Sequence, residues 1–260
     1  MLDVAATIDA LVERPSETIL LCDYDGSLAP IVDLPEDAVA LPAAIEALYE
    51  LVERVGRVAI VSGRPAEFLA DRLPVPGLVF VGLYGMESLV DGKRRVDPRA
   101  LPFAEAVAAA ADEADVRVAG TVVERKGGVS VTLHWRTTLD REQEVLAVAS
   151  DLAQRHGLDQ WHSRFAVELR PPIAIDKGTV VDDLIQGFEV AAFAGDDTGD
   201  LAAFAALARA ASDGRLTRAV RIGVRSEEMP DTLEGAVDVL VDGPVGLTEL
   251  MLQVAGRLGA

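Results

Sequence analysis

The stretch TILLCDYDGS, residues 18–27, decides the fold class of this chain. A short, mostly apolar run comes first, and Asp23 and Asp25 follow it directly. An apolar run of this length that ends in acidic residues is typical of a buried parallel strand. In open α/β sheets, ligands bind beyond the carboxyl ends of the strands. The stretch therefore predicts a parallel sheet with a functional site beside Asp23.

The segments on both sides of this strand alternate between strand and helix patterns. Strands are expected at 57–61, 78–81, 189–194, 218–224 and 237–241, helices at 3–13, 42–54, 176–187, 198–210 and 244–257, and a hairpin turn at 91–92. Such alternation indicates βαβ units and a parallel sheet. The fold class expected from these segments is α/β.

The pattern changes in the middle of the chain. A helix is expected at 99–113, strands at 118–124 and 129–136, a helix at 140–156 and a strand pair at 160–170. This order is typical of an α+β unit rather than of βαβ units. We therefore expect an inserted domain at 101–171 within a core formed by 1–100 and 172–260.

Composition excludes several classes of function. The chain has 260 residues and a formal net charge of −19, so its surface repels nucleic acids and anionic membranes, and we expect neither as a partner. No apolar run reaches membrane-spanning length, and the N-terminus lacks a signal-peptide pattern. The single cysteine, Cys22, excludes an intramolecular disulfide and fits a reducing cytoplasm. We expect a cytoplasmic monomer that acts on a small molecule.

Further polar residues follow other expected strands. Ser62 and Arg64 follow the strand at 57–61, Asp196 and Asp197 follow the strand at 189–194, and Lys177 begins the helix at 176–187. Each alone has an ordinary explanation as a helix cap, a turn former or a surface residue. Together they meet at one sheet edge, where gathered carboxylates repel unless a cation lies between them. Oxygen ligands favour Mg²⁺ over zinc.

A metal, a lysine and paired carboxylates are the parts that phosphoryl transfer needs. Asp23 is the candidate nucleophile, which would form an aspartyl-phosphate intermediate. Asp25 would protonate the leaving alcohol and then activate water. Ser62 would donate a hydrogen bond to the phosphoryl group, and Lys177 would balance the charge on Asp23 and the phosphate.

These motifs resemble those of the haloacid dehalogenase superfamily of phosphatases, and more closely those of the trehalose-6-phosphate phosphatase family. The matching segments are DYDGSLAPI at 23–31, SGR at 62–64, KGGVSVTLHWR at 126–136, ELRP at 168–171, KG at 177–178 and GDD at 195–197. The resemblance covers nearly the whole chain, in order. It implies a magnesium-dependent phosphatase that hydrolyses trehalose 6-phosphate to trehalose and phosphate.

The resemblance also implies a structure and a metal site. The core would be Rossmann-like, and the inserted α+β domain would be a cap of the C2 type that closes over the substrate. Mg²⁺ would be held by Asp23, by the backbone carbonyl of Asp25 and by Asp196. We count Asp197 with these candidate metal-site residues and expect Asp200 to support them.

Candidate substrate-binding residues come from both parts of the chain. Arg64 and Tyr84 belong to the core, and by motif position Glu124, Lys126, Arg136 and Glu168 would grip sugar hydroxyls from the cap. A cross-strand salt bridge between Glu124 and Arg136 is an equally good explanation of that pair. Trp135 and Trp161 could stack on a sugar ring, but packing is the favoured interpretation of both. His134 is expected to be a packed or interface histidine rather than a catalyst.

The sequence departs from the family pattern at three positions, which leaves other functions open. Tyr84 stands where the family has histidine, Gly199 replaces a threonine and Leu201 replaces an acid. A sister hypothesis is therefore a phosphatase for another saccharide phosphate or a glycosyl phosphate. A non-catalytic regulatory domain of the same fold is less favoured because the core motifs are intact. A phosphomutase would transfer phosphate between sugar positions, and nothing in the sequence requires it.

Overall fold

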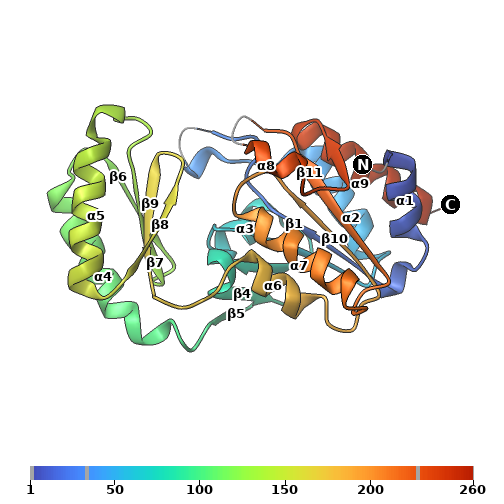
Figure 1. Ribbon diagram of the computed structural model, residues 1–260, viewed down its shortest axis with the longest axis horizontal. Coiled ribbons are helices and arrows are strands. Elements are labelled where there is room, and N and C mark those ends of the chain that lie inside the picture. The colour runs from blue at the N-terminus through green and yellow to red at the C-terminus, as the bar shows by residue number, and fades with distance from the viewer. Residues whose placement is uncertain (1–2, 33–34, 227–228, 260) are drawn as a thin grey trace. The chain divides into compact units, whose positions relative to one another are not determined.

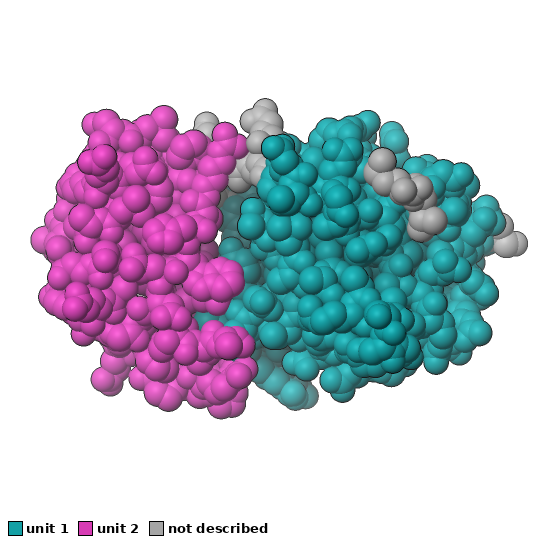
Figure 2. All heavy atoms as spheres, in the orientation of Figure 1, with its two compact units in different colours: residues 1–95, 175–260 teal, residues 96–174 magenta. Residues whose placement is uncertain are grey.

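The computed structural model describes residues 3–32, 35–226 and 229–259. The chain divides into two compact units, which Figure 2 shows in teal and magenta. The first unit combines Met1–Arg95 with Ile175–Ala260, and the second is Val96–Ala174. Because the chain leaves the first unit and later returns to it, the second unit is an insertion.

The first unit is built on a sheet with the strand order β12-β11-β10-β1-β2-β3-β4-β5. Figure 1 labels β11, β10, β1, β4 and β5 of this sheet. The strands are β1 (Thr18–Cys22), β2 (Arg57–Val61), β3 (Val79–Gly82), β4 (Glu87–Val90), β5 (Lys93–Val96), β10 (Val190–Gly195), β11 (Arg218–Val224) and β12 (Val239–Val241). The strands from β12 to β3 pair in parallel, and β4 pairs antiparallel with β3. β1 lies between β10 and β2, and its side chains are therefore mostly buried on both faces of the sheet.

Helices cover both faces of this sheet. They are α1 (Val4–Val12), α2 (Pro42–Val52), α3 (Ala66–Arg72), α6 (Lys177–Leu184), α7 (Asp200–Ser212), α8 (Asp231–Glu234) and α9 (Gly243–Leu258). Leu11, Leu48 and Leu250 bring α1, α2 and α9 into one core cluster with the sheet. On the other face, the ring of Phe204 from α7 meets Phe193 of β10 edge to face, with centroids 5.7 Å apart.

The turn after β1 is fixed by Tyr24. The side chain of Tyr24 is fully buried, and its hydroxyl donates a hydrogen bond of 3.0 Å to the carbonyl of Ala38. The Tyr24 carbonyl in turn accepts hydrogen bonds from the N–H groups of Leu28 and Ala29, both at 2.9 Å. The backbone on both sides of Tyr24 is therefore held rigidly, which fixes the neighbouring Asp23 and Asp25.

The second unit is a sheet with the order β6-β7-β9-β8, backed by two helices. Its elements are α4 (Ala104–Arg117), β6 (Val122–Lys126), β7 (Ser130–His134), α5 (Glu142–His156), β8 (Asp159–Ser163) and β9 (Ala166–Arg170). Val131, Leu133, Val167 and Leu169 form a core with the helices. The alternate positions of these strands form the opposite face, which carries most of the polar side chains of the sheet.

The structure confirms the expected α/β class, the parallel sheet and the hairpin turn at Asp91 and Gly92, which both have positive φ. One boundary was wrong. The helix expected at 99–113 begins at Ala104 and continues to Arg117, and the strand expected from 118 begins at Val122. Gly120, with φ of +92°, marks the reversal that separates the two elements. In the part of the chain that the structure describes, no helix is both long and apolar enough to cross a bilayer.

Gly82 offers a test of the close packing at the end of β3. A Cβ atom there would lie 2.5 Å from the Ala66 nitrogen and 2.7 Å from the Arg64 carbonyl oxygen, both backbone atoms. We expect Gly82→Ala to lower the free energy of unfolding by about 2 kcal/mol or more in denaturant titrations. Gly256→Ala is the matched control, because nothing lies within 4 Å of the added Cβ in helix α9. That control should be neutral or stabilise by up to about 1 kcal/mol, and equal effects of the two substitutions would contradict the prediction.

Candidate active site

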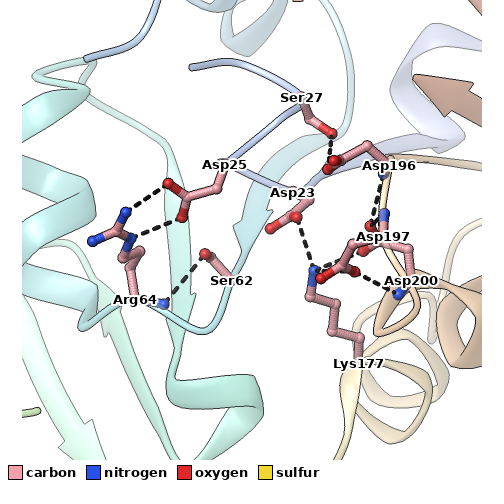
Figure 3. A network of polar contacts seen from close by, with 9 residues as sticks. All are labelled: Asp23, Asp25, Ser27, Ser62, Arg64, Lys177, Asp196, Asp197 and Asp200. Carbon is pink, nitrogen blue, oxygen red and sulfur yellow. Dashed lines mark hydrogen bonds and ion pairs between the residues drawn. The ribbon is translucent and has the colours of Figure 1, made fainter. Parts of the chain in front are cut away.

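Three parallel strands and the starts of two helices, α6 and α7, bring the polar residues of the first unit together (Figure 3). Cys22, the last residue of β1, lies beside Ala194 of β10 and Ile60 of β2. The residues that follow these strands therefore share one edge of the sheet. The N–H of Asp23 extends the ladder with a hydrogen bond of 2.8 Å to the Ala194 carbonyl.

Lys177 lies at the centre of this edge and is 2% exposed. Its Nζ is 3.0 Å from Asp23 Oδ2, 2.7 Å from Asp200 Oδ1 and 4.0 Å from Asp197 Oδ1. Asp176 caps the helix that Lys177 begins, in a capping box with Thr179. The cap fixes the first turn of α6, and the ammonium group is thereby fixed among the carboxylates.

Asp200 organises the loop after β10. Its Oδ1 accepts a hydrogen bond from Lys177, and its Oδ2 accepts hydrogen bonds from the N–H groups of Asp196, at 2.8 Å, and Asp197, at 3.0 Å. A Cβ on Gly195 would lie 2.3 Å from the Asp200 carboxyl carbon, so glycine is required there. Both oxygens of Asp200 are thus engaged in positioning other groups.

Asp196 brings the loop after β10 against the turn after β1. Its carboxylate lies so close to Gly26, whose φ is +73°, that a Cβ there would be 2.0 Å from Oδ2. The Ser27 hydroxyl contacts Asp196 Oδ1 at 3.5 Å (Figure 3). Asp196 is 3% exposed, so its carboxylate is almost completely desolvated.

Arg64 holds Asp25 with two parallel hydrogen bonds. Its Nε donates to Asp25 Oδ2 at 2.8 Å, and one terminal nitrogen donates to Oδ1 at 2.7 Å. The guanidinium also lies over the ring of Phe68, 4.9 Å from its centroid. The Arg64 N–H contacts the Ser62 hydroxyl at 3.3 Å, which joins the loop after β2 to Asp25.

Tyr84 packs against the same loop. Its N–H donates to the Ser62 carbonyl at 3.0 Å, and its ring lies where a Cβ on Gly63 would come within 2.6 Å of Cζ. Leu83 and Tyr84 both have positive φ, at 51° and 56°, which side-chain-bearing residues adopt rarely. This strained backbone is held by the hydrogen bonds to the loop and places Tyr84 beside the Ser62 segment.

Burial and crowding of like charges shift the pKa values at this edge. Burial raises the pKa of Asp23 to about 7, opposed by Lys177 and supported by Asp197 and Asp196. Burial, followed by the charge of Asp200, raises the pKa of Asp196 to about 8. Lys177 is held charged because Asp200 and Asp23 outweigh the effect of burial and raise its pKa above the usual value. One buried ammonium therefore only partly neutralises the several carboxylates around it.

The donor set fits a divalent cation that prefers oxygen ligands. Asp23, Asp197 and Asp200 each offer a carboxylate oxygen, and these three atoms lie within 4.8 Å of one another. Because Asp200 already uses both oxygens, Asp23, Asp197 and the neighbouring Asp196 are the better candidates for ligands. The Asp25 carboxylate is engaged by Arg64, so its available donor is the backbone carbonyl. Oxygen donors alone, without histidine or cysteine, suit Mg²⁺ or Ca²⁺.

Three sugar-binding candidates of the second unit, Glu124, Lys126 and Glu168, lie on the polar face of its sheet. Lys126 Nζ is 3.2 Å from Glu168 Oε2 and 4.0 Å from Glu124 Oε2. His134 lies 2.9 Å from Glu124, and the Arg136 guanidinium lies 5.1 Å from the centroid of the Phe165 ring. The structure therefore gathers Glu124, Lys126 and Glu168 and gives His134 a hydrogen-bond partner.

Comparison with known proteins identifies the family. Residues 21–232 match the model of the trehalose-phosphatase family. The chain belongs to the trehalose-phosphatase family. The trehalose-phosphate phosphatase of Mycobacterium marinum is 31% identical over 259 residues, which are 95% of this chain and 63% of that protein. The chain thus spans just under two thirds of the length of this curated relative.

Solved structures show the same fold for this family member. A trehalose-6-phosphate phosphatase related protein is 23% identical and matches with a TM-score of 0.78, over 92% of this chain and 97% of its own. A haloacid dehalogenase-like hydrolase from Bacteroides thetaiotaomicron is 15% identical and matches with a TM-score of 0.66, over 91% and 99%. The trehalose-phosphatase family member therefore has the haloacid dehalogenase fold that its motifs predict.

Sequence reasoning missed Glu87, which supports the site of this trehalose-phosphatase family member. Glu87 is 2% exposed, accepts the Ala66 N–H at 2.6 Å and pairs with Arg94, so it supports the start of α3. No motif in the sequence marks Glu87. Of the two tryptophans expected to be packing residues, Trp135 is buried at 3% exposure, whereas Trp161 is 36% exposed and packs on the Arg170 guanidinium.

The raised pKa values predict how pH affects the metal-free protein. Asp23 and Asp196 hold protons in the folded state up to about pH 7 and 8, whereas the unfolded chain releases them near pH 4. Stability should therefore fall as pH rises through this range. With chelator present, we expect a melting temperature several degrees lower at about pH 8.5 than at about pH 6.

Mg²⁺ should restore most of this loss at the higher pH, because a cation replaces the missing protons. Asp196→Asn removes one of the two titrating groups, so the pH effect should shrink in that variant. Asp182→Asn is the control, since Asp182 lies in an exposed ion-pair cluster with Arg209 and Arg215. A metal-free melting temperature that rises between these pH values would contradict the assignment.

Proposed function

We propose that this chain hydrolyses trehalose 6-phosphate to trehalose and inorganic phosphate, with Mg²⁺ as cofactor. The observation that carries the proposal is the buried contact of 3.0 Å between Lys177 Nζ and Asp23 Oδ2. Two positions after Asp23 lies a second acid, Asp25, which Arg64 orients. Family membership supports phosphate ester chemistry, and the relatives are named trehalose-phosphate phosphatases.

The first half-reaction transfers the phosphoryl group to Asp23. A carboxylate oxygen of Asp23 attacks phosphorus, and the bond between phosphorus and the sugar oxygen breaks. The leaving alkoxide takes a proton from Asp25, which gives the free sugar. Lys177 neutralises charge on Asp23 and on the phosphoryl oxygens, and the Ser62 hydroxyl donates a hydrogen bond to one of those oxygens.

The second half-reaction returns the enzyme to its starting state. Asp25, now a carboxylate, accepts a proton from water while the water oxygen attacks phosphorus. The bond between phosphorus and the Asp23 oxygen breaks, and phosphate leaves. When bound, Mg²⁺ would supply a positive charge that stabilises the phosphoryl oxygens. The residues that would hold Mg²⁺ are Asp23, Asp196, Asp197 and, through its backbone carbonyl, Asp25.

Arg64 adds a condition to this cycle. Both oxygens of Asp25 accept hydrogen bonds from Arg64, so Asp25 reaches a leaving oxygen only after Arg64 releases one of them. A substrate phosphate is a stronger attraction for a guanidinium than a single carboxylate, because it offers more charge and more oxygens. Arg64 would therefore pass from Asp25 to the substrate, as its assignment to substrate binding requires.

We further propose that the second unit acts as a cap of the C2 type and supplies the sugar contacts. Glu124, Lys126 and Glu168 offer acceptors and a donor on one face, as recognition of sugar hydroxyls requires. The single buried cysteine, Cys22, supports a reducing, cytoplasmic location, and the net charge of −19 disfavours nucleic acid as a partner. The proposal includes a monomer that acts on a small molecule.

A second candidate is a phosphatase for another disaccharide phosphate or a glycosyl phosphate. Tyr84 favours it, because a neutral hydroxyl stands beside the Ser62 loop where the family pattern has a histidine. Both candidates predict the same chemistry at Asp23 and differ only in the alcohol that is released.

A panel of sugar phosphates, assayed for phosphate release with Mg²⁺ and with chelator, tests the proposal. We expect trehalose 6-phosphate to give the highest kcat/KM and chelator to abolish turnover. Asp23→Asn should lower kcat by about a thousandfold or more, because the nucleophile is lost. Asp182→Asn, an exposed substitution of the same kind, should leave kcat unchanged. Equal turnover of many monosaccharide phosphates would overturn the choice of substrate.

Asp25→Asn tests the proton transfer. Sugar alkoxide is a poor leaving group, so its departure requires an acid, whereas acetate leaves from acetyl phosphate without one. We expect the rate constant for phosphorylation of the enzyme by trehalose 6-phosphate, measured in a rapid-quench single turnover, to fall about a hundredfold or more. Phosphorylation by acetyl phosphate should fall only a few-fold. An equal loss with both substrates would rule out Asp25 as the acid.

A further inference from the structure

Trp161 occupies an unusual place in the second unit. In the register of the sheet, Trp161 of β8 pairs with Glu168 of β9, which pairs with Thr132 of β7, which pairs with Glu124 of β6. Directly paired residues share one face of a sheet. Trp161 therefore ends a row of polar side chains, on the face opposite the helices. We call these four residues the polar row.

The ring of Trp161 is held in place while much of it stays accessible. The guanidinium carbon of Arg170 lies 3.5 Å from the centre of the ring, and Arg170 itself is 2% exposed. Trp161 is 36% exposed. The other tryptophan, Trp135, lies in the hydrophobic core of this unit. The buried Arg170 guanidinium thus packs on the indole ring of Trp161, while part of the apolar ring surface faces solvent.

The polar row contains hydrogen-bonding groups that the described protein does not satisfy. Glu168 is 5% exposed and Thr132 is 3% exposed, and neither Glu168 Oε1 nor Thr132 Oγ1 has a hydrogen-bond partner among the described residues. Buried polar atoms are nearly always hydrogen-bonded in folded proteins. These two atoms therefore point to a ligand that carries hydroxyl groups.

A pyranose ring has the matching chemistry. Its C–H groups form an apolar face that packs on an aromatic ring, and its hydroxyl groups radiate from the rim toward carboxylates, hydroxyls and ammonium groups. Ligand sites commonly combine aromatic surface with a few such polar groups. A tryptophan that served only to cover Arg170 would not explain the unsatisfied oxygens beside it.

We propose that Trp161 is the platform on which a pyranose ring of the substrate stacks, with Glu168 and Thr132 bonded to its hydroxyls. This inference rests on the proposed function for its sugar phosphate substrate. It assigns to Trp161 a role in specificity: the residue favours phosphate esters of sugars over phosphates that carry no ring. Trp161 takes no part in the chemistry at Asp23.

Kinetics of Trp161 variants test the proposal. We expect Trp161→Ala to lower kcat/KM for trehalose 6-phosphate about tenfold or more, which is about 1.4 kcal/mol. The value for acetyl phosphate, which has no ring, should stay within about twofold of the wild type. Trp161→Phe keeps an aromatic ring and should recover most of the loss. The matched control is His162→Ala, because His162 is exposed on the same strand but pairs with Val167, on the alternate face.

Three kinetic results would overturn the assignment. The first is an unchanged kcat/KM for trehalose 6-phosphate in Trp161→Ala. The second is an equal loss on acetyl phosphate, which would indicate general damage. The third is an equal loss in His162→Ala. If the wild type hydrolyses acetyl phosphate but no sugar phosphate, the proposed function fails, and the binding measurement below decides the inference alone.

Tryptophan fluorescence measures binding without turnover. The chain has two tryptophans, and only Trp161 is exposed to solvent. Titration with trehalose should produce a saturable change in emission, and glycerol at matched viscosity should not. Trp161→Phe should abolish that change. A change that persists in Trp161→Phe comes from Trp135 and overturns the proposal, as does the absence of any change in the wild type.

Discussion

The buried ammonium of Lys177 is the charge on which the arrangement of the site depends. It contacts Asp23 and Asp200 from the first turn of α6. Removing an ammonium and two carboxylates from water costs free energy that only close pairing offsets. Asp200 then fixes the N–H groups of Asp196 and Asp197, so one cation sets the position of a whole loop. Lys177 therefore couples the candidate nucleophile Asp23, the start of α6 and the loop after β10.

The same centre leaves negative charge uncompensated. Burial and neighbouring carboxylates raise the pKa of Asp23 and of Asp196 because one ammonium does not neutralise all of them. A protein that merely needed stability would place apolar residues at such a position. An edge that gathers carboxylates and holds them rigid is suited to a divalent cation and a phosphate that arrive together. The crowded, buried carboxylates thus both lower the stability of the folded protein and form the candidate site for a cation and a phosphate.

Recognition is separated from this chemistry along the chain. The residues proposed to react lie in the first unit, at strand ends and helix starts, which are rigid positions. The candidate sugar contacts lie on the polar face of the inserted unit, where Lys126 pairs with Glu168 and Trp161 stands on Arg170. The inserted sheet is free to vary on this face because its own core lies on the other side, against α4 and α5.

The sequence by itself determined the strand ends, because an apolar run followed by Asp23 or Asp196 is a local pattern with a local cause. It also determined the insertion and, through its motifs, the family. Only the tertiary structure decided which partners the side chains contact. Both oxygens of Asp200 accept hydrogen bonds that position other groups, and Arg64 donates to both oxygens of Asp25. The tertiary structure also decided that Trp161 is exposed while Trp135 is buried. Those outcomes depend on contacts between segments far apart in the chain, where geometry and desolvation choose among partners that the sequence leaves equally open.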